Sequence, residues 1–396
     1  MEEYIFFFGR SPELSFAELS AFVPTLKKND VGASINAVPV FIDGREIAIP
    51  DLLAILGGTT RIGRAVNKLP AITPQEIAHA LSKPASSSVT FGLSSFSSDF
   101  KVTNQFLSEV KRILAGTSHH VRFILPRHGE TLSTAGLGGE VQELCVIGKT
   151  GNFTLSQTIA AQPIDQWVSR DIRRPYIDAK RGMLPPKVAR MMVNIGFGND
   201  SRGKTLLDPF CGMGTIAMES FLRGVRTIAS DLSVEVVEKA KKNIATLKDT
   251  KEVPPVSFHT SDATHVSSFL LDQKIDVVVT EPFMGTAKLG EGKIFKSSEI
   301  RNIMKGLEKL YIGCLREWKS ILTDRGVVVI ALPEIDWNAR SYGVKKVIDR
   351  CEMYGYTKVL GPLPYSRPQA VVRRMIYVLK TGHATRIQET RKKVRK

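Results

Sequence analysis

Two acidic residues, Asp208 and Glu281, each follow an apolar run and could bind a ligand or take part in a reaction. Asp208 ends a short apolar run and precedes a turn that contains Gly212 and Gly214. Glu281 follows the mostly apolar run 275–279 and opens the segment Glu281-Pro282-Phe283. Glycines let a backbone bend sharply and approach a ligand closely, and open α/β sheets bind their ligands at the carboxyl ends of the strands. The two segments therefore predict a cofactor site beside a reaction site.

The turn after Asp208 fits two kinds of cofactor. Its glycine pattern, with Asp231 nineteen residues after Gly212, is typical of a dinucleotide site, and an NAD-dependent oxidoreductase is one alternative. A carboxylate at Asp208 would repel a pyrophosphate but attract the ammonium or sulfonium group of S-adenosylmethionine, so charge favours the second cofactor. Asp231 would then bind the ribose hydroxyls, and Asp262 would meet the adenine, although a helix N-cap explains Asp262 equally well. The predicted cofactor contacts are Asp208, Pro209, Phe210, Cys211, Gly212, Gly214, Thr215, Asp231, Leu232, Asp262 and Ala263.

The segment Glu281-Pro282-Phe283 is the predicted catalytic site. An exocyclic amine of a nucleic acid base is a poor nucleophile because the ring delocalises its lone pair. Acceptors at Glu281 and at the Pro282 carbonyl, aligned with the N–H groups, would direct that lone pair at a methyl group. Phe283 would stack on the base. The alternative is an ordinary loop whose Phe packs into the core and whose Glu faces water.

Alternating strands and helices must position these two sites. The patterns predict strands at 205–208, 226–230, 256–259, 275–280, 326–332, 357–361 and 371–379, and helices at 214–223, 234–247, 298–322 and 341–354. Such a series, closed by two strands without a helix between them, indicates a mostly parallel sheet with an antiparallel strand near one edge. The segment 198–205 fits the Walker A pattern. Because a helix precedes it and a strand follows it, we do not expect a nucleotide triphosphate site there.

The positive net charge is concentrated in the C-terminal part of the chain. Residues 1–165 contain 14 Lys and Arg against 15 Asp and Glu, whereas residues 166–396 contain 41 against 24. Such an excess favours a nucleic acid partner, because basic patches gain affinity by releasing counterions from phosphates. The predicted RNA contacts lie in one basic stretch, at Arg170, Arg173, Arg174, Lys180, Arg181 and Lys187.

Composition argues against other classes of protein. No apolar run approaches the roughly 20 residues of a membrane span, and the opening Met1-Glu2-Glu3 lacks the basic start of a signal peptide. The four cysteines are far apart and form no CxxC pair, which argues against a zinc site and a disulfide framework. We therefore expect a cytoplasmic protein that holds no metal and contacts no membrane.

The chain is long enough for two domains. Residues 1–165 have α+β character, with a strand at 4–8 and a helix that begins at Pro12. Residues 166–200 are expected to form a basic linker and the first helix of the catalytic domain, which begins at Pro186. Residues 201–382 carry the α/β series, and residues 383–396 form a basic tail.

Four segments of the chain match a known family. They are Tyr4–Ser15, Leu56–Ile62, the linker Arg170–Ala189 and the cofactor loop Asp208-Pro209-Phe210-Cys211-Gly212-Met213-Gly214-Thr215. In them the chain resembles the THUMP-domain RNA guanine-N2 methyltransferases, the type that acts at position ten of tRNA. The resemblance implies a Rossmann-like S-adenosylmethionine methyltransferase domain preceded by an α+β, THUMP-containing RNA-binding region. It also implies that the substrate is the exocyclic N2 amine of a guanosine in tRNA.

The reaction-site segment departs from the family's pattern. The family carries Asp-Pro-Pro-Tyr where this chain has Glu281-Pro282-Phe283-Met284-Gly285. In one register Glu281 replaces the Asp and Met284 the Tyr. In the other, Thr280 replaces the Asp and Phe283 the Tyr, with one residue inserted before the glycine. This departure keeps open a second alternative, a non-catalytic RNA-binding protein with a degenerate methyltransferase domain. A small activator subunit is compatible with either alternative.

Overall fold

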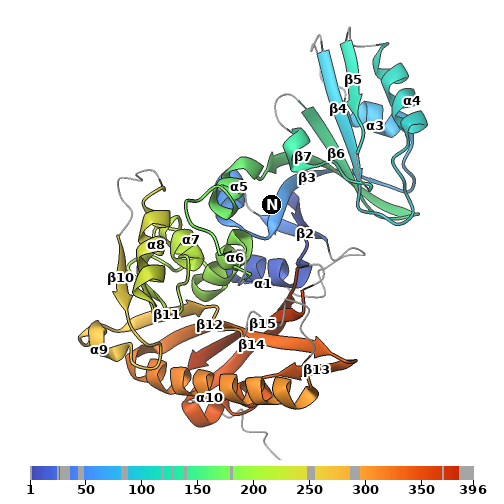
Figure 1. Ribbon diagram of the computed structural model, residues 1–396. Coiled ribbons are helices and arrows are strands. Elements are labelled where there is room, and N and C mark those ends of the chain that lie inside the picture. The colour runs from blue at the N-terminus through green and yellow to red at the C-terminus, as the bar shows by residue number, and fades with distance from the viewer. Residues whose placement is uncertain are drawn as a thin grey trace, which may run out of the picture. The chain divides into compact units, whose positions relative to one another are not determined.

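The chain forms two compact units, each with its own sheet (Figure 1). The computed structural model describes residues 2–24, 26, 36–42, 49–81, 88–116, 120–126, 129–137, 141–178, 182–247, 255–285, 295–367 and 370–382. The first unit comprises Met1–Arg174 and Pro185–Asn199, and the second comprises Pro175–Leu184 and Asp200–Lys396. Among the described residues, no helix is both long and apolar enough to cross a membrane.

The second unit is built on one sheet with the strand order β10-β9-β8-β11-β12-β15-β14, and β13 pairs with β12. Its strands are β8 (Thr205–Asp208), β9 (Arg226–Asp231), β10 (Val256–Thr260), β11 (Ile275–Thr280), β12 (Leu322–Trp337), β13 (Arg340–Gly343), β14 (Tyr356–Tyr365) and β15 (Val372–Thr381). Strands β8 to β12 run parallel, whereas β15 is antiparallel to both β12 and β14. The predicted mostly parallel sheet with an antiparallel strand near one edge is confirmed.

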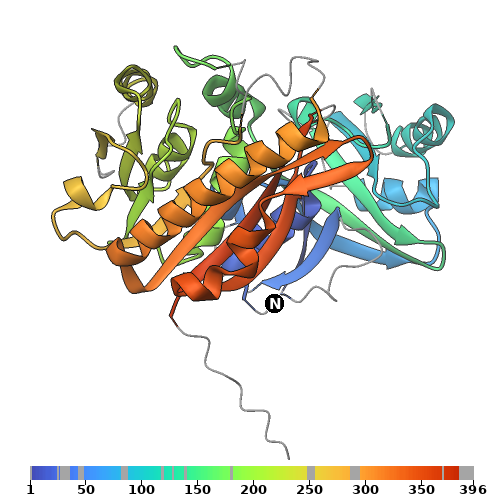
Figure 2. The same cartoon turned by 60° about the horizontal axis from the view of Figure 1, so that its bottom comes forward.

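Helices cover both faces of this sheet (Figures 1 and 2). One face packs against α9 (Ser267–Leu270), α10 (Ser297–Ile321), α11 (Lys345–Asp349) and the 3-10 turn Cys351–Tyr354. The other packs against α7 (Thr215–Phe221) and α8 (Val234–Ile244). Neighbouring residues of β9 show the division, because Ile228 belongs to the core under α10 and Ala229 to the core under α7 and α8. Successive side chains of a strand point to opposite faces, so β9 is apolar on both.

The order of the strands reverses between β8 and β11. From β8 the chain proceeds outward to β9 and β10, and then returns to the other side of β8 for β11 and β12. Val278 of β11 pairs with Leu207 of β8 in a parallel ladder. The carboxyl ends of these two strands therefore lie side by side. Ligands of open α/β sheets bind at such a reversal point.

The predicted helix at 341–354 is wrong in its first part. Residues 340–343 form β13, and α11 begins only at Lys345. Strand β12 runs five residues beyond its predicted end at 332, to Trp337, and turns back through Asn338 and Ala339, whose φ angles are 48° and 59°. Two successive positive φ angles are typical of the tight turn that joins a β-hairpin. Residues 341–343, which their spacing predicts to be helical, therefore belong to the second strand of this hairpin.

The first unit contains a seven-stranded sheet in the order β2-β1-β3-β7-β6-β4-β5. Its strands are β1 (Glu2–Phe8), β2 (Ala37–Ile42), β3 (Thr59–Leu69), β4 (Ser88–Ser95), β5 (His120–Ile124), β6 (Val141–Lys149) and β7 (Asn152–Ala161). Its helices are α1 (Pro12–Phe22), α2 (Ile49–Ile55), α3 (Pro74–Leu81), α4 (Asn104–Leu114), α5 (Ile164–Asp171) and α6 (Pro186–Phe197), with a 3-10 turn at Thr134–Leu137. The predicted strand at 4–8 and the predicted helix starts at Pro12 and Pro186 are confirmed. Helix α6, which the sequence predicts as the first helix of the catalytic domain, clusters with the first unit, because most of its contacts are with residues of that unit.

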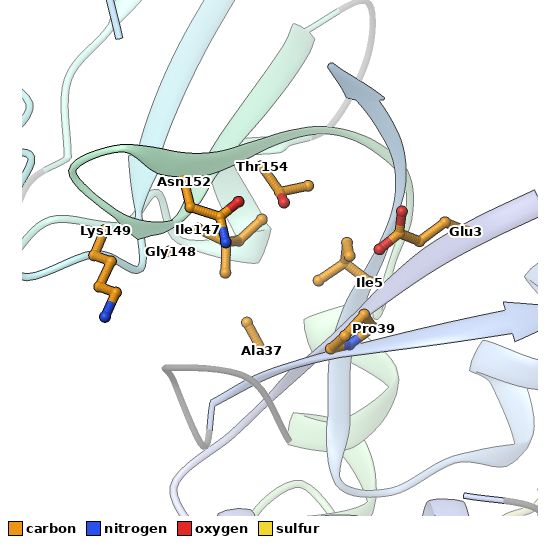
Figure 3. Close-up of a pocket in the computed structure, with 9 residues that line it drawn as sticks. All are labelled: Glu3, Ile5, Ala37, Pro39, Ile147, Gly148, Lys149, Asn152 and Thr154. Carbon is orange, nitrogen blue, oxygen red and sulfur yellow. The ribbon is translucent and has the colours of Figure 1, made fainter. Parts of the chain in front are cut away.

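The first unit contains separate apolar cores, of which two are large. One joins β1, β2 and β3 to α1 and α2. The other joins β4 to β7 with α3 and α4, which lie together beside β4 and β5 (Figure 1). A cavity of about 160 Å³ lies between β1, β2, β6 and β7, with Ile5, Ala37 and Ile147 among its lining residues (Figure 3). None of its lining residues is a predicted site residue, so the cavity does not mark the predicted site.

Candidate functional site

Asp208 lies at the reversal point of the second sheet, at the carboxyl end of β8. Its side chain is buried, at 1% exposure. Thr280, the last residue of β11, donates its hydroxyl to Asp208 Oδ1 at 2.9 Å. Burial is the main cause that raises the pKa of this carboxyl to about 7. The charges of Asp231 and Glu281 act in the same direction, and the Thr280 hydrogen bond opposes them. An acid held under such repulsion would be favoured in its ionised form by a nearby cation.

The loop after Asp208 is fixed by backbone contacts to β9. Cys211 N donates to the Ser230 carbonyl at 2.8 Å, and Gly212 N donates to Asp231 Oδ2 at 3.1 Å. Gly212 and Gly214 have φ angles of 50° and 81°, in the region that favours glycine. These contacts place the loop across the ends of β8 and β9, as the sequence predicts for a cofactor loop.

The two glycines differ in their surroundings. A Cβ atom at Gly214 would lie 3.2 Å from the Ala240 Cβ on α8, so this glycine permits close packing of the loop on a helix. A Cβ atom at Gly212 would meet nothing within 4 Å. Open space beside Gly212, with two carboxylates at the ends of β8 and β9, fits a ligand that carries hydroxyls and a positive charge. The residues present therefore fit S-adenosylmethionine.

The other predicted cofactor contacts surround this loop. Asp231 Oδ1 accepts a hydrogen bond from Ser233 N at 3.1 Å, so each of its carboxylate oxygens already accepts one backbone N–H. Each oxygen can accept a further hydrogen bond. Leu232 is 73% exposed. Pro209, Cys211 and Thr215 are buried, and Phe210 is half-buried against the core under α10.

Asp262 follows β10 and organises its own turn. Its Oδ1 accepts from the backbone and the hydroxyl of Thr264, both at 2.8 Å, and these bonds lower its pKa. These contacts make a local side-chain turn. They are not a helix N-cap, because the N-cap residue of α9 is Val266. The neighbouring Ala263 is buried, and its carbonyl accepts from Trp318 Nε1 at 3.0 Å. Both residues follow β10, whose last residue Thr260 pairs with Asp231 of β9. An adenine contact at Asp262 stays a prediction.

Glu281 directly follows β11 and forms an ion pair with Arg374 of β15. Only 16% of the Glu281 side chain is exposed. Burial raises the pKa of its carboxyl, and the charge of Arg374 opposes that rise. The backbone of Leu184 also hydrogen-bonds to this carboxylate. Glu281 therefore does not face water freely, as the ordinary-loop interpretation would require.

Phe283 presents its ring at the same edge of the sheet. The side chain is 56% exposed, although the residue lies in a segment whose backbone is held. Tyr311 of α10 donates its hydroxyl to the Phe283 carbonyl at 2.6 Å, and Pro282 beside it is buried. A fixed backbone that carries an exposed aromatic ring suits a stacking surface for a base.

Asn243 and Arg374 are site residues that the sequence analysis missed. Asn243, buried on α8, donates to the Met213 and Tyr176 carbonyls, each at 2.9 Å, and so joins the cofactor loop to segment 175–184. Arg374 occupies an inward-facing position of β15, since Ile376 and Val378 on the same side are buried. A charged residue in register with inward apolar residues was the signal that could have found it.

The predicted RNA contacts fall into three groups. Arg170 and Lys187 lie over the ring of Trp167, at 4.3 Å and 5.3 Å from its centroid, and burial lowers the pKa of Lys187 to about 8. Arg173 is exposed, whereas Arg174 is buried at 5% exposure. We therefore leave Arg174 out of the proposed RNA contacts. Lys180, Arg181 and the basic tail 383–396 lie outside the described residues.

Comparison with known protein families finds a match that covers much of the second unit. The model of the RMKL-like methyltransferase domain matches residues 173–353. The match decides against the dinucleotide-binding alternative for the glycine loop. The second unit is thus a methyltransferase domain with a Rossmann-like fold, as the sequence predicts.

Curated relatives share part of the chain. The tRNA (guanine(10)-N2)-dimethyltransferase of Methanothermobacter thermautotrophicus is 33% identical over 165 residues, which cover 42% of this chain and 42% of that protein. The protein of the same name from Methanocaldococcus jannaschii is 31% identical over 172 residues, again 42% of each chain. The matched region spans about half the length of these relatives or less. The predicted resemblance to guanine-N2 methyltransferases is confirmed.

Among the solved structures that resemble the chain, one matches it along nearly its whole length. TrmN from Thermus thermophilus matches with a TM-score of 0.54, over 96% of this chain and 99% of that chain, at 15% sequence identity. At this identity the likeness shows the fold alone. It extends the shared fold to both units.

Proposed function

We propose that this protein is an S-adenosylmethionine-dependent tRNA methyltransferase that methylates the exocyclic N2 amine of a guanosine. One observation carries the proposal. Asp208 and Thr280, which end β8 and β11, are hydrogen-bonded at the reversal point of the sheet, and the glycine loop and Glu281-Pro282-Phe283 begin at the same place. This arrangement supports a methyl donor and an acceptor base meeting at one edge. The names of the relatives support the choice of base and RNA.

The cofactor would supply a methyl group bound to a positively charged sulfur. Asp208 would face its positively charged part, and the Asp231 carboxylate would accept from its ribose hydroxyls. The open space beside Gly212 would receive the ligand close to the backbone. Pro209, Phe210, Cys211, Gly214 and Thr215 would hold the loop, with Leu232, Asp262 and Ala263 near the adenine.

The base would leave its stack to reach the pocket. Phe283, with its exposed ring, would stack on it. The Pro282 carbonyl and the Glu281 carboxylate would accept from the amine and fix its orientation. A carboxylate has about four acceptor positions, so the contacts of Glu281 with Arg374 and Leu184 leave room for the amine. Orientation is what this poor nucleophile needs most.

The first unit would hold the folded tRNA as a THUMP-containing region. Because residues 1–165 are nearly neutral, they would recognise RNA shape or bind it by a local patch. Arg170, Arg173 and Lys187, with Lys180 and Arg181 beyond the described residues, would contact phosphates. The four cysteines are buried and form no disulfide, which agrees with a reducing cytoplasm as the place of action.

Mass spectrometry of nucleosides tests this proposal. Unmodified tRNA is incubated with the protein and the cofactor, digested and compared with tRNA incubated without the protein. We expect N2-methylguanosine or N2,N2-dimethylguanosine, and digestion into fragments then gives the position.

A second function is favoured by the altered reaction-site segment. A non-catalytic RNA-binding protein would bind tRNA but transfer no methyl group. The same incubation with tritium-labelled cofactor decides between the two functions. Binding of tRNA without any transfer of tritium would establish the second.

A further inference from the structure

The side chain of Arg374 connects two parts of the reaction site that lie far apart in the sequence. Arg374 is on β15 and is buried at 8% exposure. Its Nε donates to Glu281 Oε1, and one of its terminal nitrogens donates to the Gly182 carbonyl at 2.5 Å. A single guanidinium thus holds the reaction-site acid and the segment 182–184. A planar guanidinium is suited to such a contact because its donors point in fixed directions.

Segment 182–184 is fastened to the site by further contacts. Arg367 donates to the Met183 carbonyl at 2.9 Å, and the backbone of Leu184 hydrogen-bonds to the Glu281 carboxylate. Within the second unit, this segment and Glu281 therefore form one hydrogen-bonded cluster with Arg374 at its centre. The cluster adjoins Phe283, whose carbonyl is held separately by Tyr311.

Burial favours the protonated form of Glu281, and Arg374 favours the ionised form. An ionised carboxylate only accepts hydrogen bonds, whereas a protonated one offers a donor. Burial raises the pKa of Glu281, and Arg374 is the strongest opposing influence. The other charged or titratable groups that act on or near it are Arg367 between β14 and β15, Asp208 on β8 and Tyr311 on α10. Without Arg374, the acid would tend to protonate and would turn away from an incoming amine.

We propose that Arg374 is a positioning residue for methyl transfer. Arg374 keeps the Glu281 carboxylate ionised and oriented toward the amine, and it fixes this carboxylate to segment 182–184. This inference rests on the proposed function. Arg374 acts through Glu281 and does not touch the base. The competing explanation is a buried ion pair that only stabilises the fold, since removing one member of such a pair leaves an uncompensated charge.

The test compares Arg374→Gln, Arg374→Lys, Glu281→Gln and the double variant Arg374→Gln/Glu281→Gln. The matched control is Arg373→Gln, because the neighbouring Arg373 pairs with Glu334 and Asp336 at 2.6 Å and 3.0 Å and lies outside the site. For each protein we would measure the cofactor Kd by calorimetry, kcat and KM for tRNA, and the dependence of kcat on pH. The titration of the Glu281 carboxyl would be followed by carbon-13 NMR in the absence of RNA.

Arg374→Gln should lower kcat at neutral pH by about 10- to 100-fold, a loss typical of a displaced catalytic group. Its cofactor Kd should change by less than about twofold, and its deficit should shrink as pH rises, because Glu281 would then ionise at higher pH. Arg374→Lys should restore the pH profile but only part of kcat, since a single ammonium replaces the planar fork. The double variant should be no slower than Glu281→Gln, because Arg374 acts through Glu281. Arg373→Gln should match the unmodified protein.

Two results would overturn the inference. One is an Arg374→Gln protein whose kcat is reduced equally at every pH with an unshifted Glu281 titration, as a purely structural role predicts. The other is a double variant much slower than Glu281→Gln. If the unmodified protein transfers no methyl group to tRNA, the proposed function fails instead, and the NMR titration still decides whether Arg374 controls the charge of Glu281.

Discussion

At the scale of single residues, the electrostatics of the site centre on Asp208. Its carboxyl is buried, and Asp231 and Glu281 repel its negative charge, which together with burial raises its pKa to about 7. A bound cation would reverse this balance, because an opposite charge favours the ionised form. Cofactor affinity should therefore depend on the protonation of this one side chain.

The affinity for S-adenosylmethionine should rise with pH. Only the ionised Asp208 attracts the ligand, so with a pKa of about 7 the affinity at about pH 6 should be roughly tenfold lower than above about pH 8. Asp208→Asn should bind weakly at all of these pH values. Calorimetric titration of both proteins across the range measures the difference and cancels the ligand's own titration. A pH dependence shared by both proteins would remove Asp208 from cofactor binding.

Phe283 should matter for the RNA and not for the fold. Stacking of a base on an aromatic ring contributes about 1–3 kcal/mol, so Phe283→Ala should reduce kcat/KM for tRNA by about 5- to 150-fold. Because the ring is 56% exposed, the free energy of unfolding and the cofactor Kd should hardly change. Steady-state kinetics and denaturant unfolding measure the two effects.

Two variants serve as controls for the Phe283 measurement. Phe283→Tyr keeps the ring and should retain activity. Met353→Ala removes a side chain that is 75% exposed on another part of the second unit, and it should leave kcat/KM unchanged. Equal losses in Phe283→Ala and Met353→Ala would contradict a stacking role.

At the scale of elements, the loop between β8 and α7 combines a structural glycine with a ligand-facing one. Gly214→Ala would place a Cβ 3.2 Å from the Ala240 Cβ at a φ of 81°. A left-handed conformation costs a residue other than glycine about 1–2 kcal/mol, and the close contact adds to this. We expect the free energy of unfolding to fall by roughly 2 kcal/mol or more, as measured by denaturant titration.

Gly212→Ala should separate stability from binding. Its φ of 50° carries a similar strain, but its Cβ would meet nothing within 4 Å. We expect a smaller loss of stability and a larger loss of cofactor affinity than at Gly214. Gly224→Ala, at a φ of 70° with open space around it and outside the loop, gives the effect of strain alone. An unchanged cofactor Kd in Gly212→Ala would place the ligand away from this glycine.

Segment 175–184 is the element that ties the site together. Tyr176 is joined to the cofactor loop through Asn243, and Gly182 is joined to the reaction segment through Arg374. All of these hydrogen bonds lie within the second unit, although the bonded residues are between 30 and 192 positions apart along the chain. The linker signature in the sequence is therefore also part of the methyltransferase site.

At the scale of the whole molecule, charge should govern RNA binding. Residues 166–396 carry 41 basic against 24 acidic residues, so tRNA affinity should fall steeply as salt rises. Arg173→Gln should weaken binding and reduce the slope of log affinity against log salt by about 0.7–0.9, the value of one phosphate contact. Fluorescence titrations at several salt concentrations measure the slope.

The control for the salt measurement is a cation that already has a partner. Lys239 pairs with Glu235 at 2.5 Å on α8, so Lys239→Gln should leave the slope nearly unchanged. If both variants changed the slope equally, the general charge of the surface would explain binding and Arg173 would hold no particular phosphate.

Several elements could be predicted because they depend on local patterns. The strands β8, β9 and β11 alternate with helices at spacings that indicate a parallel sheet. The glycines alone predict the position of the cofactor loop. The hairpin at Asn338 and Ala339 could not be predicted, because its residues fit a helix as well as a turn. The pairing of β12 with β15 as far as Ile335, and with β13 as far as Trp337, decides between them.

Residue types and their spacing are enough to predict which side chains carry the chemistry. These are Asp208 at the end of β8, Glu281 directly after β11 and the glycines of the cofactor loop. Residue types and their spacing are properties of short segments, so they can be interpreted without knowledge of the tertiary structure. The protonation state and the orientation of these side chains depend on the tertiary structure. It brought Arg374 to Glu281 across 93 positions and buried Asp208 beside Thr280. Burial and long-range ion pairs set these properties, and both arise only when distant strands join in one sheet.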